Sequence, residues 1–188
     1  MNKVLVAVIV IVVVIGIIGM SVVGAYNSMV TMSENVDAQW AVVESKLQRR
    51  YDLIPNLVNS VKGVMAQEKE VFKNIADARA KLAGAGTTRE EVAASNELEG
   101  ALSRLLVVME NYPQLRSVES VNNLMDELAG TENRISVERD RYNMSVNEYN
   151  SSIKKIPKNV LAGMFGFEPK LYFEATEGAE VAPEVQFD

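Results

Sequence analysis

Residues 4–23 read VLVAVIVIVVVIGIIGMSVV, and this stretch decides the fold because it contains no charged residue. At a rise of 1.5 Å per residue, a helix of about 20 residues crosses the ~30 Å hydrocarbon core of a bilayer. A helix of this length in a water-soluble protein keeps a polar face, whereas this stretch has none. The sequence therefore predicts a transmembrane anchor over residues 1–25.

A cleaved signal peptide is the alternative interpretation of the same stretch. Val23 and Ala25 are acceptable residues before a cleavage point at Tyr26. However, the apolar run is longer than the roughly 7–15 residues that are typical of a signal peptide. We therefore expect the anchor to stay attached.

The charges that flank the span predict its orientation. Lys3 and the terminal amine precede the span, and the next basic residue after it is Lys46. Glu34, Asp37 and Glu44 make the following segment acidic. Because positive charge is retained in the cytoplasm, we expect a cytoplasmic N-terminus and a domain on the other side of the membrane.

The composition excludes several classes of function. The 188 residues contain no Cys and no His, which excludes disulfides, a cysteine nucleophile, a lipobox and Ser-His-Asp catalysis. Zinc sites built from Cys or His are excluded on the same ground. A net charge of -6 and a pI near 4.9 argue against nucleic acid as a partner. We expect a protein that is not an enzyme and needs no cofactor.

Helical periodicity continues behind the anchor. Apolar residues from Val36 to Leu82 recur at heptad spacing, which predicts one long helix that is kinked near Pro55 and ends at Gly84. Thr88 and Glu91 have the spacing of a capping box that would start a second helix.

Further helices are expected up to Pro113, from near Ser117 to Pro157, and over a short piece around residues 160–165. No strand-like alternation occurs outside the span. The predicted fold is all-α, with the transmembrane helix running into an elongated antiparallel helical bundle over residues 26–167.

The end of the chain, residues 168–188, is predicted to be an extended acidic tail. It holds six acids against Lys170 and therefore carries -5 of the net charge. Such a composition is typical of a solvated tail. Apolar residues such as Leu171 and Phe173 leave open that it packs as an extended segment.

Polar residues occupy helical positions where a bundle buries its faces. An unpaired buried charge is costly, so those on the first long helix are expected to pair with those on the third. We interpret them as a network that fixes helix register, with a ligand or partner site as the alternative. The residues are Arg49, Arg50, Asp52 and Asn56 on the first helix and Glu132, Arg139, Asn143 and Asn147 on the third.

Several motifs together resemble the LemA family. The resemblance begins with Tyr26-Asn27 and continues through most of the chain. Its motifs are Trp40-Ala41, Leu47 to Val58 (LQRRYDLIPNLV), Val61-Lys62-Gly63, Glu110 to Pro113 (ENYP), Glu127 to Ile135 (ELAGTENRI), Tyr142-Asn143, Tyr149-Asn150, Phe165-Gly166-Phe167 and Pro183 to Phe187 (PEVQF).

The resemblance implies a single-pass protein of the bacterial cell membrane with a helical-bundle domain and no enzymatic activity. Some relatives carry a lipobox Cys before the Tyr-Asn pair, where this chain has Ala25. The family is also described with a short extracellular N-terminus, so the resemblance leaves the orientation open.

The leading functional hypothesis is a self-associating scaffold at the cell envelope that contacts membrane lipids and shapes the membrane. Gly16, Gly19 and Gly24 would let spans approach each other. The helix next to the membrane would supply an exposed, coiled-coil-like contact at Val36, Trp40 and Val43. The alternative is an accessory or signalling subunit that docks onto another membrane protein, such as an envelope protease.

Overall fold

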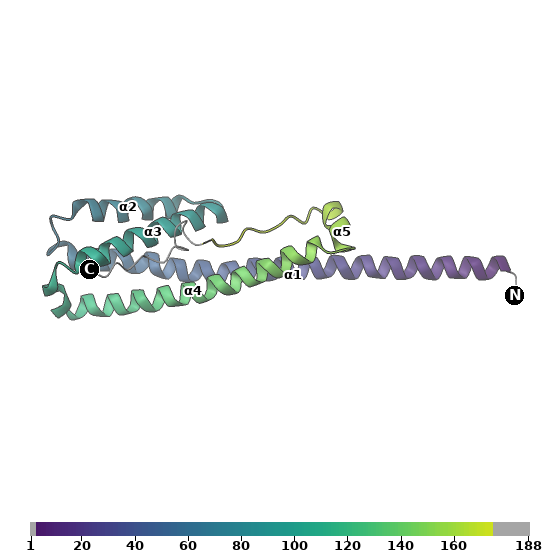
Figure 1. Cartoon of the computed structure of the whole chain (residues 1–188), viewed down its shortest axis with the longest axis horizontal. Helices are drawn as coiled ribbons and strands as arrows, with labels where there is room; N and C mark the ends of the chain where they lie inside the picture. Colours follow the sequence, from purple (N-terminus) through teal and green to yellow (C-terminus); the bar gives the residue numbers. More distant parts are fainter. Residues whose placement is uncertain (1–2, 175–188) are drawn as a thin grey trace, which may run out of the picture. The chain divides into compact units, whose positions relative to one another are not determined.

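The computed structural model describes residues 3–174, and these residues form helices and no strands. The all-α prediction is confirmed (Figure 1). Most of the predicted acidic tail, residues 175–188, lies outside the described residues. The elements are α1 (Lys3–Lys62), α2 (Lys69–Gly84), α3 (Thr88–Met109), the 3₁₀ helix η1 (Pro113–Ser117), α4 (Glu119–Lys154) and α5 (Lys158–Phe165).

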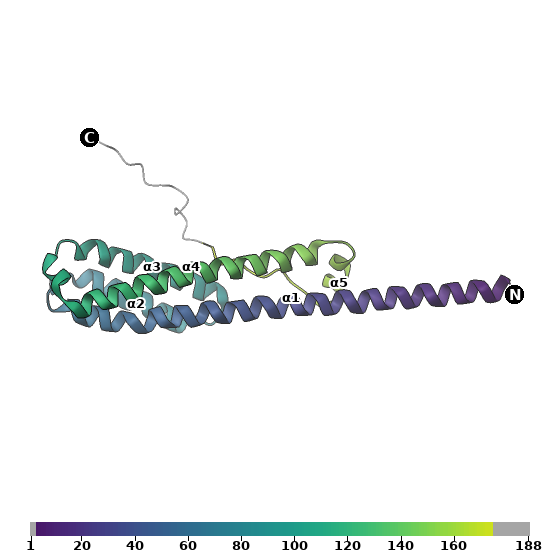
Figure 2. The same cartoon turned by 90° about the horizontal axis from the view of Figure 1, so that it is seen from below.

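The chain divides into two compact units, each containing parts of α1 and α4. One unit consists of the chain up to Ala41 together with Arg141–Lys170, which includes α5. The other consists of Val42–Asp140 together with the chain from Leu171 onward. We call them the α5 unit and the core unit. In each unit, α1 and α4 run antiparallel and side by side (Figures 1 and 2).

The span is part of one long helix. α1 continues from Lys3 past Pro55 to Lys62. It is long and apolar enough to cross a membrane, and within residues 3–174 nothing buries its most apolar stretch. A core helix of a soluble protein would be covered, so the exposed surface indicates a membrane anchor.

The predicted length of the first helix is wrong, because α1 ends at Lys62 rather than near Gly84. The Val61 carbonyl accepts hydrogen bonds from the amides of both Val64 and Met65, each at 3.0 Å, and the chain turns back into α2. Val61 and Met65 are both buried in the core unit. The apolar spacing therefore continues through the turn and conceals it.

The start of α3 also differs from its prediction by one residue. The N-cap is Thr87, whose hydroxyl accepts a hydrogen bond from the Glu90 amide at 3.3 Å. In return the Glu90 carboxylate accepts the Gly86 amide at 2.9 Å. This bond, followed by the contact with Thr87, lowers the pKa of Glu90. Thr87 and Glu90 thus form the reciprocal cap that was expected of Thr88 and Glu91.

The core unit encloses one hydrophobic core. Residues from α1, α2, α3, η1 and α4 contribute to it and exclude water from the middle of the unit. Its members are Ile54, Leu57, Val61, Met65, Val71, Ile75, Ala78, Leu98, Leu102, Leu105, Leu115, Val121 and Leu128.

The α5 unit is held by aromatic pairs. The Trp40 ring lies 5.2 Å from the Tyr142 ring, which links α1 to α4. Tyr26 makes edge contacts with Phe165 at 5.0 Å and with Phe167 at 5.7 Å. Gly166 adopts a φ of 75°, a conformation that ends α5 and turns the chain toward Phe167.

A short extended segment then returns along the α5 unit. Asn150 on α4 accepts the Lys170 amide at 2.8 Å and donates to the Lys170 carbonyl at 2.9 Å. The Lys170 ammonium bonds Asp37 on α1 at 2.7 Å. These bonds fix the beginning of the region predicted as an acidic tail.

The expected exposure of Val36, Trp40 and Val43 requires a correction. Val36 and Val43 are fully buried, and Trp40 is half-buried against Tyr142. The expectation failed because it assumed a first helix far longer than its partners. With α1 ending at Lys62, about 37 residues follow the span, or ~55 Å, and the 36 residues of α4 give a similar length.

Because Tyr142 is buried, we expect the stability of the α5 unit to depend on pH. Burial, with a smaller effect of the Asp37 carboxylate, raises the pKa of Tyr142 from its ordinary value of 10.0 to about 12. A raised pKa stabilises the folded state below pH ~10, and this stabilisation disappears as the pH rises toward 12. Urea unfolding in detergent should show a steeper loss of stability between about pH 9 and 11 for the native chain than for Tyr142→Phe. Identical slopes would contradict the assignment.

Candidate functional site

A buried arginine lies at the centre of the core unit. Arg50 on α1 is 0% exposed, and its guanidinium meets α3 and α4. One nitrogen donates to both Glu132 carboxylate oxygens at 3.2 Å. The other donates to the Ser95 carbonyl at 3.1 Å and to the Ser95 hydroxyl. A single side chain therefore ties three helices together.

A second arginine extends this group of charges. Arg139 on α4 donates to Glu99 at 3.1 Å and to the Asn96 side-chain oxygen at 3.2 Å. Glu99 also lies 3.9 Å from Arg50. The two guanidinium groups thus share two carboxylates, Glu99 and Glu132, so that their formal charges cancel. We call Arg50, Ser95, Glu99, Glu132 and Arg139 the arginine cluster.

The arginine cluster also holds the extended segment after Lys170. The Arg139 guanidinium lies over the Phe173 ring at 4.2 Å from its centre, and Phe173 is buried. The Asn96 side chain donates to the Glu174 carbonyl at 3.1 Å. Leu171 and Tyr172 remain exposed. For residues 168–174, the packed extended segment is therefore the correct one of the two interpretations of the tail.

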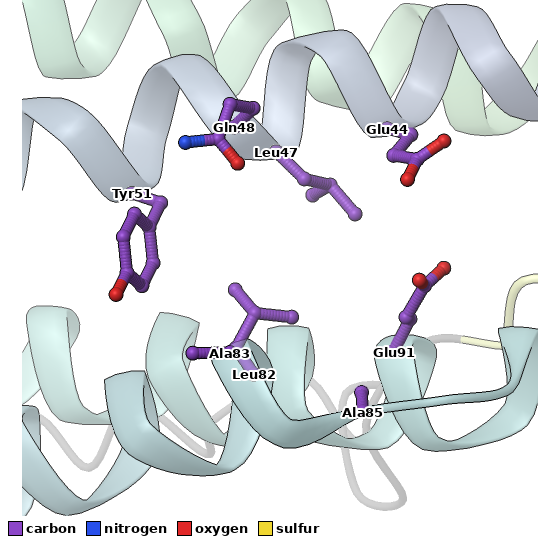
Figure 3. Close-up of a pocket in the computed structure, with 8 residues that line it drawn as sticks. All are labelled: Glu44, Leu47, Gln48, Tyr51, Leu82, Ala83, Ala85 and Glu91. Carbon is purple, nitrogen blue, oxygen red and sulfur yellow. The ribbon is translucent and has the colours of Figure 1, made fainter.

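The core unit also contains a cleft whose lining includes no residue of the arginine cluster. It has a volume of about 360 Å³ and lies between α1 and the α2–α3 connection. Figure 3 shows the Glu44 and Glu91 carboxylates at one end and the Tyr51 ring at the other, with Leu47 and Leu82 between them. The Arg79 guanidinium lies 4.2 Å from the centre of the Tyr51 ring, a favourable cation–π contact.

Two nitrogens remain without an acceptor within the described part of the chain. They are the Nε atoms of Arg50 and Arg79, both buried. A buried donor without an acceptor costs free energy, so these arginines stay only because their other contacts compensate for the cost. The arrangement constrains which helices can pair and in which register.

The predicted polar network is only partly assembled into this site. Arg50, Glu132 and Arg139 come together, whereas Arg49 forms an exposed ion pair with Glu127 on the surface. Asp52 and Asn56 are exposed. Asn143 and Asn147 belong to the α5 unit, whereas Arg49, Arg50, Asp52 and Asn56 belong to the core unit.

Sequence reasoning missed Ser95, Asn96 and Glu99, all on α3. Ser95 and Glu99 are four residues apart and lie next to the buried Leu98. A serine and a glutamate at helical spacing beside apolar core positions were the available signal. Without knowing which helix faces Arg50, that signal does not select them.

The chemistry of the arginine cluster is limited to charge pairing and hydrogen bonding. Its serine hydroxyl is engaged by a guanidinium rather than by a base. Within residues 3–174, no group of three or more acidic side chains is placed to hold a metal ion.

The buried Arg50 predicts a large loss of stability on truncation. Arg50→Ala removes the donor to Glu132 and to the Ser95 hydroxyl. Because the Glu132 side chain is 32% exposed and can be hydrated, we expect a loss of about 1–3 kcal/mol. Arg49→Ala is the matched control, since its exposed pair contributes only about 0–1 kcal/mol. Urea unfolding monitored by circular dichroism compares them. Equal stabilities of the two variants would contradict the role of Arg50.

Comparison with known proteins places the chain in a family. Residues 39–187 match the LemA family. Magnetosome proteins MamQ 1 and MamQ 2 of Paramagnetospirillum magneticum are each 32% identical to this chain over 175 aligned positions. Magnetosome protein MamQ of Magnetospirillum gryphiswaldense is 30% identical over 174 positions.

Each of these alignments covers 79% of this chain and 64% of the relative. The chain thus aligns with less than two thirds of the length of these relatives. The family match includes the helix that carries Arg50 and the helices that carry its partners. Because this match extends over most of the chain, the protein belongs to the LemA family.

Proposed function

We propose that this protein is a non-catalytic, membrane-anchored scaffold whose copies associate through their spans at the bacterial envelope. The observation that carries the proposal is the uncovered apolar stretch of α1, which continues as the same helix into the bundle. Covering that stretch requires lipid, another span, or both. The relatives are named as magnetosome proteins, and those names supply no activity, so the proposal rests on this chain's own residues.

A structural role of the arginine cluster supports the non-catalytic part. Arg50 is fully buried and bonds only to groups of its own chain in the contacts described above. A catalytic group must reach a substrate, and a guanidinium surrounded by three helices does not. The same contacts explain why these residue types are present without any reaction.

The glycines of the span support the association of copies. In the part of the chain that the structure describes, a methyl group added at Gly16, Gly19 or Gly24 would meet no atom within 4 Å beyond its own stretch of helix. Each glycine costs about 1 kcal/mol relative to alanine in a helix, and packing within the chain does not offset this cost. Close approach of a second helix does offset it, as in other membrane proteins whose spans pair through small residues.

For orientation we propose a cytoplasmic N-terminus. Lys3 is the basic residue closest to the span in sequence. The positive-inside rule, by which Lys and Arg next to a span stay in the cytoplasm, counts charges within roughly 15–20 residues of the ends of the span. Lys154, Lys155 and Lys158 follow the span by more than a hundred residues, so they do not enter this count. The bundle then lies on the extracytoplasmic side.

A labelling experiment tests the orientation. The chain lacks cysteine, so Ser103→Cys provides a single thiol at an exposed position of α3. An impermeant maleimide should label this thiol in intact cells or right-side-out vesicles. A cysteine in place of Asn2 is the opposite control and should react only after permeabilisation. The reverse pattern would show that the bundle is cytoplasmic.

A second experiment tests the association. The double variant Gly16→Ile, Gly19→Ile should lose energy transfer between donor- and acceptor-labelled copies in liposomes, because branched side chains keep the helices apart. Ala7→Ile adds bulk on the same span away from these glycines and should leave energy transfer unchanged. Wild-type protein that stays monomeric across lipid compositions would remove the scaffold proposal.

One observation favours the alternative, an accessory subunit that docks onto another membrane protein. The cleft bounded by Glu44, Leu47, Tyr51 and Glu91 combines apolar walls with two carboxylates. Its chemistry fits an apolar side chain followed by a basic one. Glu44→Lys with Glu91→Lys would abolish such docking without affecting energy transfer between copies of this chain, which separates the two functions.

A further inference from the structure

The α5 unit exposes an apolar strip that the fold does not cover. Ile156, Val160 and Met164 follow at steps of four residues, which places Val160 and Met164 on one face of α5. They are 85%, 62% and 72% exposed, and the neighbouring Phe165 is 49% exposed. Four large apolar side chains gathered on one short helix and its preceding turn are unusual for a surface in water.

Contacts within the α5 unit tie this strip to the end of the span. Tyr26 lies three residues beyond Val23, about 4.5 Å along the helix axis. Its ring contacts Phe165 at 5.0 Å and Phe167 at 5.7 Å. Two residues further along α1, the Ser28 hydroxyl lies 2.9 Å from the Lys158 ammonium of α5. Figures 1 and 2 both show α5 beside α1.

The charges closest to the strip are lysines, and the nearest acids in the sequence, Glu148 and Glu168, lie just outside it. Residues 149–167 contain three lysines, Lys154, Lys155 and Lys158, and no acid. On α1, residues 24–33 contain no charge at all. Lys154 and Lys155 are exposed, whereas Lys158 is engaged by Ser28 and Ser152. This region is therefore basic in a chain whose net charge is -6.

We propose that α5 and the preceding turn form a second membrane contact, which lies on the bilayer surface beside the span and binds anionic phospholipid headgroups. Ile156, Val160, Met164 and Phe165 enter the boundary between headgroups and acyl chains, and Lys154 and Lys155 pair with headgroup phosphates. Apolar side chains with adjacent lysines are the composition of helices that lie in this interface. Tyr26 stands at the level where membrane proteins concentrate tyrosine.

This inference rests on the proposed function, since the surface contact requires residues 4–23 to span the bilayer. The surface contact would also restrict how copies of the scaffold can be oriented when they associate. A single span leaves the chain free to rotate about the membrane normal, whereas a second contact fixes which side of α1 faces the lipid surface. Copies that associate through their spans would then meet in a defined rotational setting.

Fluorescence quenching by lipid tests the surface contact on the full-length chain. Single cysteines at Met164, Met144 and Ile15 carry an environment-sensitive dye in nanodiscs that contain brominated lipids. Met144 is the matched control, because it is a methionine of the same unit that is 69% exposed and lies about 15 Å from the end of α4. The dye at Met164 should be quenched and blue-shifted when the nanodiscs contain phosphatidylglycerol, and the dye at Met144 should not.

The outcomes separate this inference from the proposed function. An unquenched dye at Ile15 would mean that the span is not in the bilayer and would remove the anchor itself. Quenching at Ile15 together with a dye at Met164 as unquenched as that at Met144 would overturn the surface contact alone. A blue shift at Met164 that grows with protein concentration without lipid quenching would mean that a second copy covers the strip, which also overturns the proposal.

The lysines are tested in the same way. Lys154→Glu with Lys155→Glu should reduce the quenching at Met164 in nanodiscs that contain phosphatidylglycerol, while quenching at Ile15 stays unchanged. Equal quenching of the dye at Met164 in phosphatidylcholine alone would overturn the assignment of anionic headgroups. The circular dichroism of the double variant should match that of the native chain, since neither lysine has a side-chain contact described above.

Discussion

The uncovered apolar stretch of α1 is the constraint on which the rest of the structure depends. Each large apolar side chain that leaves water contributes about 1.5–3 kcal/mol, so the 16 Val, Leu, Ile and Met residues at positions 4–23 contribute tens of kcal/mol. The net stability of a folded domain is only about 5–15 kcal/mol. The transfer of this stretch into lipid therefore exceeds the net stability expected of a folded domain, and the membrane determines where the remaining residues can act. In the proposed surface contact, the aromatic pairs of Tyr26 and the lysines near α5 lie at the boundary of this lipid.

Inside the core unit, the arginine cluster has a different role from the hydrophobic core. Apolar burial supplies the driving force for folding, but many helix registers would bury similar area. The two terminal nitrogens of Arg50 find acceptors only when Ser95 of α3 and Glu132 of α4 reach them together. A shifted register would leave a guanidinium in an apolar interior, which is among the most costly errors a fold can contain. The cluster thus selects one arrangement of helices, and Arg139 extends this selection to the segment around Phe173.

Residue patterns alone predicted the span, the helical class and the burial of Arg50, because each follows from local spacing and charge. They failed where the same apolar spacing fits two structures, a continuous helix and a helix that ends in a turn. Val61 and Met65 keep heptad spacing across the turn that ends α1, so the turn was invisible and the first helix was predicted too long. This error made Trp40 seem exposed, although Tyr142 covers it. Ser95 and Glu99 were missed because the partner of a buried charge depends on which helices pack together, and spacing within one helix does not contain that information.

The central claim is that residues 4–23 remain attached and span the membrane, and the intact mass of the protein in washed membranes tests it most directly. After extraction of the membranes with alkaline carbonate, the pellet should contain the full chain of 20.7 kDa. A shorter product that begins at Tyr26 and appears in the supernatant would contradict the account, because it would show that the apolar stretch is a removed signal peptide.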